Sequence, residues 1–205
     1  MPVFQRPVRA LLSSALILAG TSFGAELLAQ DPPRATSQPA PPAAPVDPKL
    51  AALKTEALQM VQARSKQVQE IVDMLFSFQE LGFQEFESQK YLTGILEKEG
   101  FKIERGVAGI PTAWTAKWSQ GTGKPEISLG SDVDGIPQAS NKPGVGYKDP
   151  LITGAPGHGE GHNSGQAVNI VASIVVKKLM ERDKISGTIL LWPGIAEEQM
   201  AGKAF

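Results

Sequence analysis

Residues 126–134 read Glu-Ile-Ser-Leu-Gly-Ser-Asp-Val-Asp, a β-prone run that ends in two carboxylates. A segment with helical character follows at 166–180, and a second strand, Thr-Ile-Leu-Leu-Trp, is expected at 188–192 before Pro193 and Gly194 break it. Strand, helix and strand in this order are typical of α/β sheets, in which the two strands run parallel. The chain is therefore predicted to have an α/β fold with a mainly parallel sheet and flanking helices.

Further elements are expected on both sides of this unit. Asp47 followed by Pro48 is typical of a helix start, and apolar residues at helical spacing predict one long helix that ends near Gly82. A second helix is expected at 85–99, and β-prone runs occupy 101–104 and 112–118. Another helix is expected from Glu197 onward.

The N-terminal part of the chain has a different character. Two arginines precede an apolar run at 10–20, and small residues follow it, which predicts a secretory signal peptide at 1–29. The alternative is a retained anchor, but a membrane helix needs ~20 apolar residues. Residues 30–47 form a linker rich in proline and alanine, and 48–205 form the folding part. We therefore expect an exported protein, periplasmic or extracellular, without a stable membrane anchor.

The composition excludes several classes of protein. The 205 residues include 20 basic and 21 acidic side chains, so a formal net charge of −1 offers no surface for nucleic-acid phosphates. The absence of cysteine excludes a disulfide scaffold, a cysteine-ligated zinc site and a thiol nucleophile. No nucleic-acid partner is expected.

Polar side chains gather where the two predicted strands end and in the loop between them. The three clusters are Asp132 and Asp134; His158, Glu160 and His162; and Glu197 and Glu198. Because the carboxyl ends of parallel strands lie at one edge of a sheet, we expect the clusters to converge on one crevice there. Imidazole nitrogen combined with carboxylate oxygen is a donor set for zinc and similar divalent ions.

Each cluster also has a simpler interpretation. The two aspartates could lie on a solvated turn, and the His-Gly-Glu-Gly-His sequence could be a flexible surface loop. Adjacent glutamates are common at helix starts, where they complement the helix dipole. In the metal-site interpretation, one glutamate binds the ion and the other accepts a proton from water.

The chain resembles a known family in several stretches that occur in the same order. These are 91–113, Ser-Asp-Val-Asp-Gly-Ile-Pro at 131–137, Gly-His-Gly-Glu-Gly-His-Asn at 157–163, and Gly-Thr-Ile-Leu-Leu-Trp-Pro-Gly-Ile-Ala-Glu-Glu at 187–198. The family is the aminoacylase/carboxypeptidase-type metallopeptidases, and the amidohydrolase branch is the most similar. The resemblance implies a zinc-exopeptidase-like catalytic domain. It also implies two divalent metal ions, zinc or manganese, that serve to cleave the amide bond of N-acylated amino acids, aminobenzoyl-type ones included, or of short peptides.

The resemblance implies a role for most of the clustered residues. His162 and Glu198 match metal ligands, and Glu197 matches the general base. Asp134 matches an aspartate that orients a ligand, and Asp132 stands where other branches have a metal-binding histidine.

Two further residues match the family pattern less directly. The amidohydrolase branch usually has cysteine at the position of Glu160, whereas the peptidase branches have a carboxylate that bridges the two metals, so Glu160 is a candidate metal ligand. His158 matches a recurrent histidine to which the resemblance assigns no role.

Family members are longer than the folding part of this chain and have a lid and dimerisation domain and a late histidine ligand. The resemblance thus implies the N-terminal part of a longer enzyme, truncated before that domain, whose full-length parent is a homodimer. The competing hypothesis is a non-catalytic exported remnant that binds a partner or an acyl-amino acid. A reading frame that continues beyond Phe205 to a further histidine motif would favour the enzyme.

Overall fold

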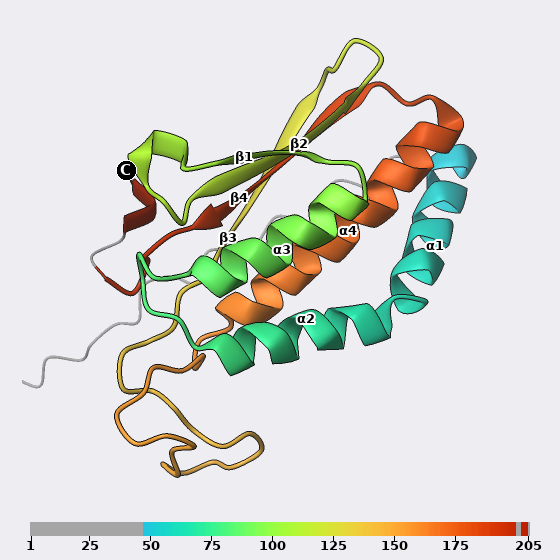
Figure 1. The fold of residues 1–205 in the computed structure, drawn as a ribbon. Helices are drawn as coiled ribbons and strands as arrows, with labels where there is room; N and C mark the ends of the chain where they lie inside the picture. The colour runs from blue at the N-terminus through green and yellow to red at the C-terminus, as the bar shows by residue number, and fades with distance from the viewer. Residues whose placement is uncertain (1–46, 200–201, 205) are drawn as a thin grey trace, which may run out of the picture. The chain divides into compact units, whose positions relative to one another are not determined.

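The computed structural model describes residues 47–199 and 202–204, and Figure 1 shows their arrangement. The predicted signal peptide, and the linker up to residue 46, lie outside the described residues. The helices are α1 (Pro48–Gln62), α2 (Ser65–Phe78), α3 (Phe86–Lys98) and α4 (His162–Asp183), with short 3-10 helices η1 (Val107–Gly109) and η2 (Gly202–Ala204). The strands are β1 (Lys102–Arg105), β2 (Trp114–Gln120), β3 (Glu126–Asp132) and β4 (Gly187–Gly194).

The strands form one mixed sheet in the order β1-β2-β4-β3. β3 and β4 are parallel, whereas β2 is antiparallel to both β1 and β4. The predicted α/β fold is confirmed, but the prediction of a mainly parallel sheet is wrong. Among the described strands, only β3 and β4 are joined through an α-helix. The short connection between β1 and β2 suits antiparallel strands, since parallel neighbours need a long crossover.

The parallel pairing brings the ends of β3 and β4 to one edge of the sheet. Asp132, the last residue of β3, lies opposite Gly194, the last residue of β4. A Cβ atom on Gly194 would overlap the Asp132 carboxylate, so glycine at this position leaves room for that side chain. Pro193 and Gly194 still pair with β3, although the sequence predicted that they would end the strand.

The core lies between the sheet and the helices that cover one of its faces (Figure 1). α3 and α4 pack against the strands, and α2 packs against α4. Trp114 of β2, Leu96 of α3 and Ile174 of α4 are fully buried there. Burial of apolar side chains of this size is the main stabilising contribution to such a fold.

The single long helix predicted from Pro48 to Gly82 is wrong, because the structure has two helices in this range. α1 ends at Gln62 and α2 begins at Ser65. Neither glycine nor proline marks the break, so the sequence carries no local signal for it. Both helices pack against α4, and the break lets the chain follow that helix in two straight segments.

The other predicted helices agree with the structure in part. The carboxylate of Asp47 accepts a hydrogen bond from the Lys49 amide at 2.9 Å, which confirms the predicted start of α1. The helix expected at 85–99 is α3. α4 begins at His162 rather than at 166. The helix expected from Glu197 does not begin there, since 197–199 form a turn, and the next described residues form the 3-10 helix η2.

Within the described ranges, no helix combines the length and the apolar character that crossing a membrane requires.

Truncation of a buried side chain on α4 should destabilise the domain. We expect Ile174→Ala to lower the free energy of unfolding by ~2–5 kcal/mol, because it removes buried methyl groups and leaves a cavity. On the same helix, Val168 is 59% exposed, and Val168→Ala should change stability by less than ~0.5 kcal/mol. Urea unfolding followed by circular dichroism measures both values; equal losses for the two variants would contradict the assignment of the core.

Candidate metal centre

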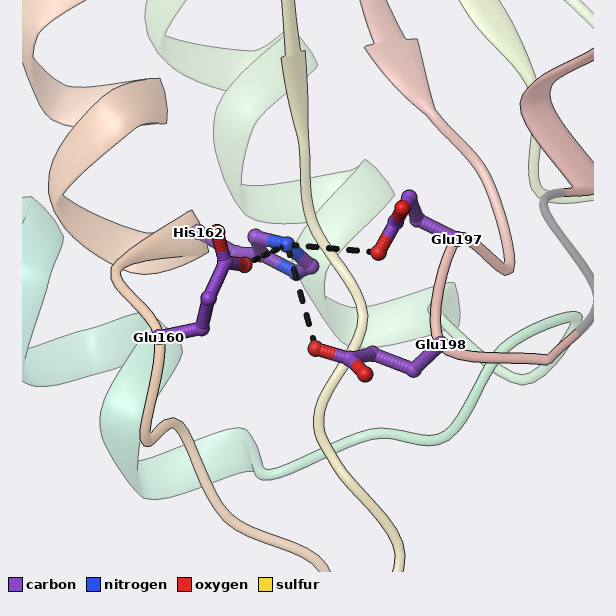
Figure 2. Close-up of side chains that lie close together, drawn as sticks. All are labelled: Glu160, His162, Glu197 and Glu198. Atoms are coloured by element: carbon purple, nitrogen blue, oxygen red, sulfur yellow. Dashed lines mark ion pairs between the residues drawn. The ribbon is translucent and has the colours of Figure 1, made fainter. Parts of the chain in front are cut away.

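Four predicted site residues come together beyond the ends of β3 and β4 (Figure 2). Glu160 precedes α4 and His162 is its first residue, while Glu197 and Glu198 lie in the turn that follows β4. One potential ligand atom from each of these four side chains lies within 4.8 Å of the other three. The expected convergence at the carboxyl edge is therefore present for these four residues.

His162 is at the centre of the group. It is buried, and its Nδ1 atom lies 2.8 Å from the backbone oxygen of Asp134. When Nδ1 donates a hydrogen bond to this carbonyl, the lone pair of Nε2 points toward the carboxylates. Nε2 lies 3.9 Å from Glu197 Oε2 and 4.0 Å from Glu198 Oε1, and a carboxylate oxygen of Glu160 is in direct contact with it.

The Nε2 atom of His162 is buried and makes no hydrogen bond. A buried polar atom that makes no hydrogen bond is costly, and such atoms are uncommon in folded proteins. Here the unsatisfied nitrogen faces three carboxylates, a set of donors typical of a divalent metal site. The residues present therefore fit a divalent metal ion.

Asp134 connects His162 to the turn that carries the glutamates. Its side chain is fully buried, and its Oδ2 atom accepts a hydrogen bond of 3.0 Å from the Glu198 amide. Its backbone oxygen meanwhile fixes the ring of His162. Burial raises the pKa of the Asp134 carboxyl, and the amide of Glu198 opposes that rise. Through these two contacts Asp134 fixes the ring of His162 and the backbone of Glu198.

Asp132 lies beside the group rather than within it. Its Oδ2 atom is 3.8 Å from His162 Nε2 and accepts a hydrogen bond of 2.8 Å from Lys203. The ammonium of Lys203 also lies 3.4 Å from Glu197 Oε1. The Asp132 carboxylate raises the pKa of Lys203. Sequence reasoning missed Lys203, because a single lysine after a glutamate pair carries no motif.

His158 does not join the site. Its Nε2 atom lies 3.1 Å from the backbone oxygen of Leu75, near the end of α2. Burial lowers the pKa of His158, which favours the neutral ring. Of the two histidines in the chain, only His162 faces the carboxylates.

The electrostatics of the group favour a cation. Burial raises the pKa of Glu198, and the charges of Asp134, Glu197 and Glu160 raise it further, while His162 opposes the rise. A cavity of about 530 Å³ borders the group and is lined by residues of β3, of α4 and of the loop before α4, among them Glu160 and His162. The site thus combines excess negative charge with open space for a small ligand.

No protein-family model matches the chain. Over 145 residues it is 33% identical to a subunit of the p-aminobenzoyl-glutamate hydrolase from Escherichia coli strain K12, a match that covers 71% of this chain and 30% of that protein. The resemblance to the amidohydrolase branch is confirmed. The chain spans less than a third of the length of this curated relative.

Solved structures show the same fold. An M20-family peptidase from Bacillus subtilis, described as binding two metals, matches with a TM-score of 0.50 and 23% identity, over 72% of this chain and 36% of that one. A protein from methicillin-resistant Staphylococcus aureus, assigned as an aminohydrolase, matches with a TM-score of 0.55 and 16% identity. The match covers 69% of this chain and 34% of that one. The chain therefore shares the fold of these solved structures, which confirms the predicted α/β fold of a metallopeptidase-type catalytic domain.

Removal of the Lys203 ammonium should strengthen cation binding. We expect Lys203→Met to bind Zn²⁺ or Mn²⁺ ~2- to 5-fold more tightly, because Asp132 and Glu197 lose a competing positive charge, although partly exposed ion pairs are individually weak. Isothermal titration calorimetry measures this affinity. The matched control is Lys178→Met, which removes an ion pair with Glu99 on the other side of the fold and should leave affinity unchanged. Weaker binding by Lys203→Met would show that the lysine assists the metal.

Proposed function

We propose that this chain is part of a metal-dependent amidohydrolase that cleaves the amide bond of N-acylated amino acids, with aminobenzoyl-glutamate as the first candidate substrate. The observation that carries the proposal is the buried Nε2 atom of His162, which has no hydrogen bond and faces Glu160, Glu197 and Glu198. The curated relative, whose name specifies hydrolysis of p-aminobenzoyl-glutamate, supports the choice of substrate.

The proposed metal ligands are Glu160, His162 and Glu198, with Asp132 at the side of the group. We propose two divalent ions, zinc or manganese, and a solved structure of similar fold is described as binding two metals. When bound, such ions polarise the amide carbonyl and make water more acidic. Asp134 holds the ring of His162 and the amide of Glu198, and so keeps both side chains in place before any ion binds.

Glu197 is the proposed general base. Its side chain is a member of the group of four but is 31% exposed, so water and substrate can reach it. The carboxylate accepts a proton from water as the water oxygen bonds to the carbonyl carbon of the substrate. The C–N bond then breaks, and Glu197 returns the proton to the leaving amine.

A non-catalytic function is the second candidate. The observation that favours it is the small number of imidazoles, since His162 alone faces the carboxylates while His158 bonds to Leu75. In this alternative the cavity binds an acyl-amino acid or a partner without hydrolysis. Under either function, we propose that the full-length parent forms a homodimer.

Replacement of Glu197 should separate chemistry from metal binding. We expect Glu197→Gln to lower turnover of p-aminobenzoyl-glutamate by ~10²–10⁴-fold, because glutamine keeps the shape but cannot accept a proton. The metal content of this variant should match that of the unsubstituted protein.

The ligand variants should behave differently. Glu198→Ala and His162→Ala should both lose metal, since each lacks a donor of the group, whereas Glu160→Cys should retain metal and shift preference toward zinc. Metal analysis beside a turnover assay distinguishes the cases. Turnover near the parent level in both Glu197→Gln and Glu198→Ala would exclude the hydrolase and favour the binding protein.

Export is proposed from the sequence of residues 1–29 alone. The mature protein should begin between Ala25 and Asp31, because a charged start, a short apolar run and small residues are typical of a cleaved signal peptide. N-terminal sequencing of the protein recovered from the periplasm or medium checks this. An intact Met1 in a soluble cytoplasmic fraction would contradict it.

A further inference from the structure

A buried carboxylate outside the metal group contacts the turn that carries two of its members. Glu85, directly before α3, is 1% exposed. Its Oε1 atom accepts a hydrogen bond of 3.0 Å from the amide of Ala196, which immediately precedes Glu197. Burial raises the pKa of this carboxyl, while the Thr112 side chain and the Ala196 amide oppose that rise. A buried carboxylate is costly to the fold unless its contacts compensate, so the contacts of Glu85 require an explanation.

The amide that Glu85 holds belongs to a residue in an unusual conformation. Ala196 has a φ of 52°, in the left-handed region that alanine rarely adopts and that costs ~1–2 kcal/mol. This conformation turns the chain as it leaves β4, and Glu197 and Glu198 follow at once. The hydrogen bond from Ala196 to Glu85 fixes the amide at the start of that turn.

The loop that contains Glu85 also packs closely on the site. In Figure 1 the connection from α2 to α3 runs beside the segment that follows β4. A Cβ atom on Gly82 would lie 2.6 Å from Ala196 Cα and 3.3 Å from Asp134 Oδ2. The Gly135 amide donates a hydrogen bond of 2.8 Å to the Glu80 backbone oxygen. The loop therefore contacts the segment after β3, which carries Asp134, and the turn after β4, which carries Glu197 and Glu198.

We propose that Glu85 is a positioning residue for the metal centre, whose carboxylate holds the Ala196 amide and so sets where Glu197 and Glu198 lie relative to His162. The inference rests on the proposed function, because it takes the group of four side chains to be a cation site. Glu85 itself contacts neither metal nor substrate. It acts only through the backbone of Ala196, and its effect should therefore follow the hydrogen bond rather than the charge.

Two substitutions at Glu85 separate these possibilities. Glu85→Gln retains a carbonyl oxygen that can accept the hydrogen bond from Ala196, whereas Glu85→Leu has similar size but no acceptor. We expect Zn²⁺ affinity, measured by calorimetry, to stay within about twofold of the parent for the glutamine variant. For the leucine variant it should fall ~10-fold or more, the usual loss when a group that orients a ligand is removed.

A third substitution controls for general destabilisation. Thr93 is fully buried on α3 and its hydroxyl donates a hydrogen bond of 2.7 Å to the Gln89 backbone oxygen. Thr93→Val should lower the thermal midpoint without changing Zn²⁺ affinity. Circular dichroism of each variant establishes that it is folded under the conditions of the titration.

The possible results are distinct. If the parent protein binds no Zn²⁺, the proposed function fails, and with it the basis of this inference. If the parent binds Zn²⁺ and a folded Glu85→Leu binds it equally well, Glu85 has no positioning role. A glutamine variant as weak as the leucine variant would also overturn the inference, because the charge would then be the essential feature.

Should Glu85→Leu fail to fold, Gly82→Ala provides the test. The added methyl group would press on the Ala196 backbone and displace the same turn without altering Glu85. We expect it to weaken Zn²⁺ binding by ~10-fold. Suppose that a folded Gly82→Ala protein and the Glu85→Gln variant both bind Zn²⁺ as tightly as the unsubstituted protein. The position of this turn would then not govern the site, and the inference would fail.

Discussion

Parallel pairing of β3 with β4 is the constraint on which the site depends. It sets Asp132 opposite Gly194, so that the chain leaves both strands at the same edge of the sheet. α4 lies between these strands in the chain. It begins at that edge with His162 and runs back toward the start of β4. The carboxylates and the imidazole therefore meet because of strand direction, and an antiparallel arrangement of β3 and β4 would have placed them at opposite ends of the sheet.

Much of this arrangement could be predicted from local sequence. The run at 126–134, the helix after His162 and the strand that precedes Glu197 each carry a periodic pattern, and one βαβ unit is enough to bring their ends together. The insertion of β4 between β2 and β3 could not be predicted, because β2 and β3 are joined by a short turn that suggests a hairpin. Strand order depends on which edges bury the most apolar surface, and that is a property of the whole domain.

The residues that sequence reasoning missed have a common feature. Lys203 and Glu85 act on the site through contacts with residues far away in the chain, Asp132 in one case and Ala196 in the other. Neither contact follows a spacing rule, since it depends on how a turn packs against a loop. The break between α1 and α2 is similar, because packing against α4, rather than a glycine or proline, determines it. Long-range packing is thus what a single sequence does not reveal.

The donor set also bears on which ion the site would prefer. One imidazole and several carboxylates make the group rich in oxygen, and no thiolate is available because the chain has no cysteine. Carboxylate oxygen suits harder ions such as manganese, whereas a thiolate at the position of Glu160 would favour softer zinc. Burial raises the pKa of Glu198 and Asp134, and so disfavours their charged forms until a cation compensates. A bound divalent ion would remove this penalty, and ion binding would therefore stabilise the fold as well as complete the site.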